Sequence, residues 1–241
     1  MSLLYKFRRL IFKLFPQLMK SKDYIEWLKA NGIDVGDGTC FFSPCTTTVD
    51  VQRPWMLKIG RYCKITAGVI ILCHDYSRSV LRRTYGEIIG EARKTLIGDN
   101  VFIGMNSIIL MGSSIGNNVI VGAGSVVSGT IPDNTVVAGN PAKVICKLDD
   151  YYRKRKSKTL DESFEYFWSF YSKYNRYPTI SEMGPFFPIF LERDKKALIE
   201  NNVFTNLSGD CENEIISQFM STEATYVNYD EYIKAAEKRN I

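Results

Sequence analysis

The stretch Ile97–Val127, IGDNVFIGMNSIILMGSSIGNNVIVGAGSVV, repeats with a period of six residues. The repeated positions hold apolar residues, namely Ile97, Ile103, Ile109, Ile115, Val121 and Val127. Glycine follows several of them directly, at Gly98, Gly104, Gly116 and Gly122. A helix repeats every 3.6 residues and a strand every 2, so neither explains a period of six. Short strands coiled into a ladder do explain it, because each needs one inward apolar residue and one tight corner.

The six-residue pattern extends upstream and is interrupted once. It starts imperfectly at residues 35–39, is clear at residues 59–63, continues at Ile65 and Ile71, and resumes at Ile97. Residues 77–94 read SRSVLRRTYGEIIGEARK, which is polar and charged and lacks the repeat. This segment is therefore predicted to leave the coiled prism as an excursion loop.

The two ends of the chain have helical rather than six-residue spacing. Residues 3–15 alternate apolar and basic side chains at helical intervals, which predicts an amphipathic segment within residues 1–32. That segment either packs on the open end of the prism or makes peripheral membrane contact through residues 1–20. Residues 149–241 predict a helical appendage without a catalytic motif, with helices at 161–174, 192–201, 212–220 and 229–239. The β-helix itself is assigned to residues 33–148.

Composition and charge favour a cytoplasmic protein, with a place at the inner face of the membrane left open. The chain has 241 residues, 45% of them hydrophobic, and a net charge of +5. It has no apolar run of membrane-spanning length and no recognisable signal peptide. Its six cysteines form no CxxC pair, so reduced and mostly buried thiols are expected. The basic run at residues 151–158 is interpreted as a solvated face, and no nucleic-acid partner is expected.

The repeat region resembles a known family. Residues 95–147, and above all the closing sequence VVAGNPAKVI at 136–145, resemble the hexapeptide-repeat acyltransferases of the galactoside, maltose and polysaccharide O-acetyltransferase branch. The resemblance covers roughly residues 33–148. It implies a left-handed parallel β-helix, and with the helical spacing at both ends the predicted fold is mainly β, with a short N-terminal helical segment and a C-terminal α-helical appendage. It also implies a homotrimer with active sites between subunits, toward which the excursion loop reaches, and acetyl-CoA as co-substrate without a metal.

The chain contains a single histidine, His74, at the junction between a repeat and the excursion loop. In the resembling enzymes the catalytic histidine lies at this junction, which implies that His74 is the general base. Imidazole suits this task because its ordinary pKa is near neutrality. Asp75 is a candidate to orient it, although neighbouring residues on a strand point to opposite faces. Cys73 is interpreted as a core residue rather than an acyl-carrying nucleophile.

The resemblance also implies contacts for CoA. The expected contacts are Met105, Ala123, Ser128, Gly129, Lys143 and Lys147. The first two are eighteen residues apart and would lie along the pantetheine arm on successive coils. The two lysines would contact phosphates, with solvated surface lysines as the alternative. Gly129 departs from the family pattern, which often has a basic residue there.

Several functions compete on these grounds. The favoured one is an acetyl-CoA-dependent O-acetyltransferase that acts on a sugar hydroxyl of a bacterial surface polysaccharide or its precursor. The alternatives are an N-acetyltransferase of an amino sugar or nucleotide-linked sugar and, less favoured, a non-enzymatic scaffold. A serine acetyltransferase is disfavoured because the helical mass here follows the β-helix. A γ-type carbonic anhydrase needs three histidines on zinc, which one histidine per chain does not supply.

Overall fold

The computed structural model describes residues 19–203 and 209–239. The chain divides into two compact units, residues 1–151 and residues 152–241. The three-part division that the sequence predicts, at 32/33 and 148/149, stays a prediction. Each unit is described separately below.

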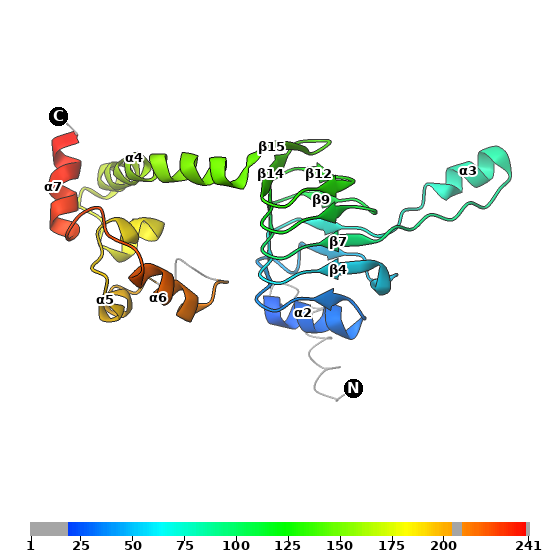
Figure 1. Cartoon of the computed structure of the whole chain (residues 1–241), viewed down its shortest axis with the longest axis horizontal. Helices are drawn as coiled ribbons and strands as arrows, with labels where there is room; N and C mark the ends of the chain where they lie inside the picture. The colour runs from blue at the N-terminus through cyan, green and yellow to red at the C-terminus, as the bar shows by residue number, and fades with distance from the viewer. Residues whose placement is uncertain (1–18, 204–208, 240–241) are drawn as a thin grey trace. The chain divides into compact units, whose positions relative to one another are not determined.

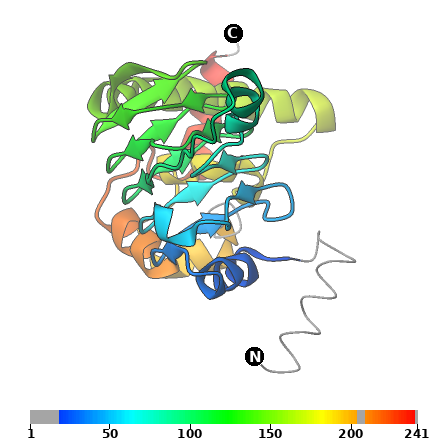
Figure 2. The ribbon, with the colours of Figure 1, turned by 90° about the vertical axis from the view of Figure 1, so that its right-hand side faces the viewer.

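The first unit is a left-handed β-helix whose short strands form three faces (Figures 1 and 2). The first face contains β1 (Asp34–Val35), β4 (Leu57–Ile59), β7 (Thr95–Ile97), β10 (Ser114–Ile115) and β13 (Thr130–Ile131). The second contains β2 (Cys40–Phe41), β5 (Lys64–Ile65), β8 (Phe102–Ile103), β11 (Ile120–Val121), β14 (Thr135–Ala138) and β15 (Lys143–Lys147). The third contains β3 (Thr48–Val49), β6 (Ile70–Ile71), β9 (Ile108–Ile109) and β12 (Val126–Val127). The predicted fold class is confirmed.

Register explains the six-residue period. Ile97 pairs with Ile115, and Ile109 pairs with Val127, so the regular coil contains eighteen residues and three repeats. Neighbouring strands are parallel, except that β15 runs antiparallel to β14. The repeated apolar side chains point into the prism and are at most 3% exposed. Burial of this continuous column is the main favourable contribution to the fold.

One end of the prism is covered by helix α2 (Ser21–Ala30). Its Tyr24 and Leu28 are buried in the same apolar core as the first coils. The Tyr24 hydroxyl also donates a hydrogen bond to the carbonyl of Thr47, at 3.1 Å. Residues 1–18, which carry most of the predicted amphipathic segment, lie outside the described residues, so membrane contact through residues 1–20 stays a prediction. Within residues 19–203 and 209–239, no helix is long and apolar enough to cross a membrane.

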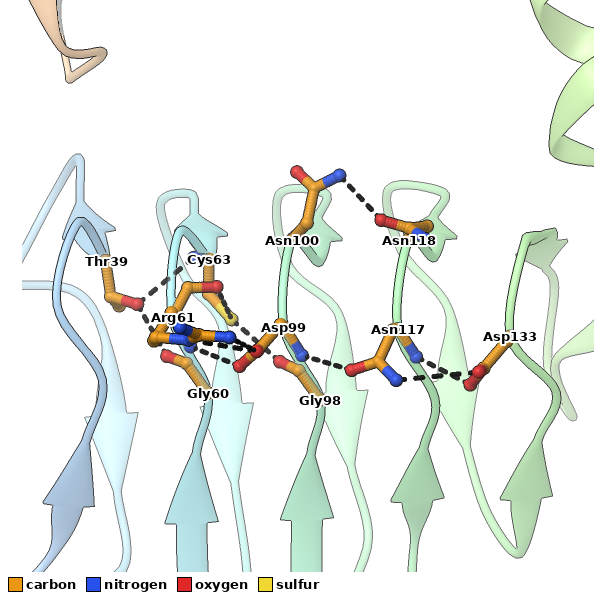
Figure 3. Close-up of polar contacts among 10 residues, drawn as sticks. All are labelled: Thr39, Gly60, Arg61, Cys63, Gly98, Asp99, Asn100, Asn117, Asn118 and Asp133. Atoms are coloured by element: carbon orange, nitrogen blue, oxygen red, sulfur yellow. Dashed lines mark hydrogen bonds and ion pairs between the residues drawn. The ribbon is translucent and has the colours of Figure 1, made fainter.

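The corner between the first and second faces is held by a ladder of side-chain to backbone bonds (Figure 3). The amide of Asp99 donates to the side-chain oxygen of Asn117, and the amide of Asn117 donates to that of Asp133, each at 2.8 Å. At the start of the ladder, Arg61 donates its backbone amide and its guanidinium to Asp99. These bonds satisfy amides that the short strands leave unpaired at each corner.

Glycine is required at this corner because successive coils approach closely. A Cβ atom at Gly98 would lie 2.6 Å from the carbonyl oxygen of Gly116, which is backbone and has no freedom to rotate away. Gly98→Ala is therefore expected to destabilise the β-helix by about 1–3 kcal/mol, the usual cost of overpacking. Denaturant unfolding followed by circular dichroism measures the change. Gly90→Ala is the matched control, since a Cβ there meets nothing within 4 Å; an equal loss in both variants would contradict the corner explanation.

The predicted excursion leaves the prism between β6 and β7 and carries helix α3 (Arg78–Tyr85), which Figure 1 shows extending away from the coils. The two arms of the excursion meet at its base, where His74 forms an antiparallel bridge with Ala92. The amide of Arg93 also donates to the carbonyl of Cys73, at 3.3 Å. The base of the excursion, and therefore His74, is thus tied to the prism.

The second unit is helical. Its elements are α4 (Leu148–Tyr174, which starts in the first unit), η3 (Ser181–Ile189), α5 (Lys195–Glu200), α6 (Glu212–Met220) and α7 (Tyr229–Arg239). Its core is rich in aromatic rings. Tyr232, for example, stacks on Phe164 with the ring centroids 5.2 Å apart, and its hydroxyl donates a hydrogen bond to the hydroxyl of Ser163. Four helices agree with the four predicted segments, although α4 begins thirteen residues before the predicted start at 161.

Candidate active site

His74 lies at the third corner of the prism, the set of turns that lead from the third face back to the first. The preceding strand β6 ends at Ile71, and the chain then turns outward into the excursion. The bridge to Ala92 fixes the backbone of His74 at the start of this turn. Its side chain is 17% exposed, so part of the imidazole is open to solvent while the rest is covered.

The hydrogen-bond partner of His74 is Asp50, which lies at the same corner one coil earlier. Asp50 follows strand β3, and its amide donates to the carbonyl of Ile71, at 2.9 Å. Its carboxylate oxygen Oδ2 contacts Nδ1 of His74 directly. The Asp50 side chain is only 4% exposed, so this contact is shielded from water. A buried carboxylate and a half-buried imidazole are thereby paired across two coils.

The electrostatics of Asp50 decide which nitrogen of His74 carries the proton. Burial acts to raise the pKa of Asp50, but hydrogen bonds from the Cys73 thiol, from the amides of Gln52 and Cys73, and from His74 outweigh it and lower the pKa below its ordinary value. The carboxylate is therefore ionised at neutral pH and only accepts hydrogen bonds. Nδ1 must then be the donor, which leaves the lone pair of the neutral imidazole on Nε2. A fixed Nε2 lone pair is what a general base needs.

Cys73 is part of the same cluster but is not suited to act as a nucleophile. It is fully buried, and its amide and thiol both donate to Oδ2 of Asp50, at 3.2 and 3.0 Å. Burial, together with the neighbouring carboxylate, raises the pKa of the thiol to about 12. The reactive thiolate is thus strongly disfavoured at neutral pH. The expectation that Cys73 packs in the core agrees with its complete burial.

Comparison with known proteins shows the family of this chain. The family model "Bacterial transferase hexapeptide (six repeats)" matches residues 94–129. Protein CapG of Staphylococcus aureus is 43% identical over 142 residues, which cover 59% of this chain and 81% of CapG. The chain belongs to the bacterial hexapeptide transferase family. It is accordingly an acyltransferase, as its relatives' names indicate.

Two further similarities are more limited in extent. WbbJ of Escherichia coli strain K12, which is named for O-acetyl transfer in lipopolysaccharide biosynthesis, is 54% identical, but over only 24% of this chain and 30% of its own. A maltose O-acetyltransferase of Clostridium difficile 630 is 28% identical, with a TM-score of 0.40, over 61% of this chain and 89% of that one. Each of these three matches, including that with CapG, leaves more than a third of this hexapeptide transferase uncovered.

Asp75 takes a different place in this hexapeptide transferase from the one the sequence suggested. Its carboxylate accepts hydrogen bonds from the amide and the hydroxyl of Ser77, at 3.1 and 2.9 Å. These bonds lower the pKa of Asp75 and fix the turn that precedes α3. The residue that contacts the imidazole is Asp50, and a catalytic role for Asp75 stays a prediction.

The expected CoA contacts of the hexapeptide transferase fall into three groups. Met105 and Ala123 lie together at the second corner, between the second and third faces, where the amide of Gly124 donates to the carbonyl of Met105. Ser128 and Gly129 follow β12 and lie at the third corner, the same corner as His74. The remaining two, Lys143 and Lys147, are exposed at the two ends of β15. The three groups therefore lie at different places on one chain: Met105 and Ala123 at the second corner, Ser128 and Gly129 at the third corner with His74, and the two lysines on β15 in the second face.

Sequence reasoning missed Asp50. The available signal was its position: it directly follows the inward residue Val49, where the equivalent positions on later coils hold Leu72, Leu110 and Ser128. Val49 pairs with Ile71, so Asp50 is level with Leu72, two residues before His74 on the next coil. The sequence thus offered an acidic residue directly after an inward apolar residue, and only the structure shows that it lies one coil before His74.

Proposed function

We propose that this chain transfers an acetyl group from acetyl-CoA to a sugar hydroxyl, with His74 as general base and Asp50 as the residue that orients it. The observation that carries the proposal is the contact between Asp50 Oδ2 and His74 Nδ1, which leaves Nε2 as the basic nitrogen of a partly exposed side chain. A hydroxyl is a weak nucleophile at neutral pH, so removal of its proton during attack is the step that needs a base.

The residues of this site supply proton transfer in both directions. Nε2 of His74 accepts the proton of the acceptor hydroxyl as the hydroxyl oxygen bonds to the acyl carbon. The imidazolium that forms is stabilised by the ionised, shielded carboxylate of Asp50. Nε2 then donates the same proton to the departing sulfur, so the base is restored without net proton exchange.

The exposed corners fit an extended acyl donor. A Cβ atom at Gly124 or Gly129 would meet nothing within 4 Å, so the backbone at both positions faces open space. Lys143 and Lys147 add positive charge suited to phosphate groups. Acetyl-CoA would supply the activated thioester there. Met105 and Ala123 lie at the second corner and Ser128 and Gly129 at the third, so a donor held between two neighbouring prisms would touch one set from each, which supports a homotrimer as part of the proposal.

The sugar acceptor rests on a narrower basis. WbbJ is named for O-acetyl transfer in lipopolysaccharide biosynthesis, and its match with this chain lies at high identity over a short region. The same dyad would also serve an amine, so an amino sugar is the alternative acceptor. Screening sugars, amino sugars and oligosaccharides against acetyl-CoA, with mass spectrometry of the products, distinguishes the two: acetyl esters support the proposal, and amides overturn it in favour of N-acetyl transfer.

Calorimetric titration with acetyl-CoA tests the donor without any knowledge of the acceptor. We expect saturable binding, weakened roughly five- to tenfold in Lys143→Ala, which corresponds to about 1 kcal/mol for one lost phosphate contact. Lys22→Ala, which removes an exposed lysine of α2, is the matched control and should bind as the wild type does. A folded protein that does not bind acetyl-CoA would contradict the proposal and favour a scaffold or another donor.

A further inference from the structure

Cys73 takes no part in the proposed proton transfer, yet it completes a cluster of three metal-ligating groups. Within residues 19–203 and 209–239, one group of histidine, cysteine and acidic side chains is compact enough to hold a metal ion: Asp50, Cys73 and His74. Its three ligand atoms all lie within 4.8 Å of one another. Two of the residues are buried and the third is half-buried, so the cluster is largely removed from bulk water.

We propose that Asp50 Oδ2, Cys73 Sγ and His74 Nδ1 form a binding site for a zinc-type divalent cation, and that the bound ion switches off the general base. Three hydrogen bonds now converge on Oδ2, and the ion would replace two of them, those from the thiol at 3.0 Å and from the imidazole, while the bond from the Cys73 amide would remain. The inhibition rests on the proposed function, whereas the metal site itself does not.

The donor set has the chemistry of a zinc site with one open position. Thiolate sulfur, imidazole nitrogen and carboxylate oxygen are the ligands that Zn²⁺ prefers, at about 2.0–2.3 Å in tetrahedral geometry. Ligand atoms then lie roughly 3.3–3.6 Å apart, which small changes in side-chain rotamers reach from the present spacing. The three protein ligands leave the fourth tetrahedral position to a water molecule, as in other open zinc sites.

The charges of the complex balance. Zn²⁺ carries two positive charges, which the Asp50 carboxylate and the Cys73 thiolate neutralise. The thiol proton is released to the buffer when sulfur coordinates the ion. The imidazole keeps its single proton, which moves from Nδ1 to Nε2 because the metal occupies the lone pair on Nδ1. The buried positions of Asp50 and Cys73 favour such a neutral complex over two separate charges.

This change of tautomer explains the inhibition. In the free enzyme, Nδ1 donates to Asp50 and Nε2 carries the lone pair that accepts the substrate proton. With metal on Nδ1, Nε2 carries the proton and has no lone pair to offer. The same three residues therefore support two exclusive states, an active hydrogen-bonded dyad and an inactive metal complex.

Titration of the full-length protein with Co²⁺, a spectroscopic substitute for Zn²⁺, tests the site in the absence of acyl donor and acceptor. We expect one ion per chain and a near-ultraviolet charge-transfer band from the thiolate–cobalt bond. Zn²⁺ should displace Co²⁺ and abolish this band. Calorimetry with Zn²⁺ in two buffers of different ionisation enthalpy should show release of about one proton per ion.

Two variants and one control assign the ligands. Cys73→Ser retains a hydrogen-bond donor but should lose the absorption band and bind at least about tenfold more weakly. Asp50→Asn should weaken binding similarly, and it keeps the proposal testable if Cys73→Ser fails to fold. Cys45→Ser removes an exposed thiol instead and should bind as the wild type does. Loss of the band in Cys45→Ser, or its retention in Cys73→Ser, would overturn the site.

The inhibitory consequence has its own measurement. Turnover with acetyl-CoA and an identified acceptor should fall with Zn²⁺ concentration, with half-inhibition near the dissociation constant from the titration, and should recover on addition of a chelator. Metal binding without loss of turnover would disprove the switch while leaving the metal site intact. Failure to find any acetyl transfer would instead contradict the proposed function. The metal site would be unaffected by that result, because the titration is carried out without acyl donor or acceptor.

Discussion

Replacing His74 with alanine is expected to lower the rate of acetyl transfer by about 10²- to 10⁴-fold, the usual contribution of a general base. The affinity for acetyl-CoA should stay near the wild-type value, because the expected donor contacts lie at other positions. Chromatographic separation of CoA from acetyl-CoA is the appropriate measurement, since thiol dyes would react with the exposed Cys45 and Cys211.

The variant His74→Asn separates the loss of the base from the loss of packing. Asparagine keeps a polar group that can donate to Asp50, but it has no basic nitrogen, so the two variants should be similarly slow. If a folded His74→Asn protein that binds acetyl-CoA turns over at nearly the wild-type rate, the role of His74 as base is wrong. If His74→Asn were nearly as fast as the wild type while His74→Ala stayed slow, His74 would act by packing and hydrogen bonding and not as a base.

Strand positions were predictable because the apolar residue of each repeat can take only one orientation. The apolar residue must point into a narrow prism, and the following glycine must allow the next coil to approach, as at Gly98 and Gly116. The period of six therefore located the inward residue of each strand in the regular coils, whereas the grouping of three repeats into one coil was implied only by the family resemblance. The helices of the second unit were predictable for a similar reason, since their aromatic residues follow helical spacing into one core.

Contacts across the irregular coils were not predictable. The regular coil has eighteen residues, but Val49 pairs with Ile71, twenty-two residues on, and Ile59 pairs with Ile97 across the excursion. No fixed interval therefore connects Asp50 with His74. The sequence offered the neighbouring Asp75 as a candidate partner, but the carboxylate of Asp75 accepts local hydrogen bonds from Ser77 in the turn.

Asp50→Asn is expected to reduce the rate of acetyl transfer by roughly 10²- to 10⁴-fold, as loss of an orienting carboxylate does in hydrolytic triads. The amide that replaces the carboxylate has two orientations. With its oxygen toward Nδ1, the charge that stabilises the imidazolium is lost; with its NH₂ group toward Nδ1, the proton is forced onto Nε2. The measurement is the same chromatographic assay, with binding of acetyl-CoA as the check that the fold persists.

The stability that this variant loses relative to the wild type should depend on pH in a defined direction. The pKa of Asp50 is lowered in the folded protein, so its ionised form stabilises the fold. That contribution is fully present above the unfolded-state pKa of about 3.9 and is lost as pH falls through the folded-state value. The difference in unfolding free energy between the wild type and Asp50→Asn, measured with denaturant, should therefore be larger at neutral pH than in strong acid.

Asp75→Asn is the matched comparison, because it also removes one carboxylate charge close to His74. The asparagine side chain in this variant would retain an oxygen that accepts the hydrogen bonds from Ser77. A much larger rate loss in Asp50→Asn than in Asp75→Asn would assign the orientation of the imidazole to Asp50, as the contact between Oδ2 and Nδ1 indicates. The opposite ranking would mean that the excursion rearranges when substrate binds and that Asp75 replaces Asp50 at the imidazole. The comparison thus tests whether this pairing is the one used in catalysis.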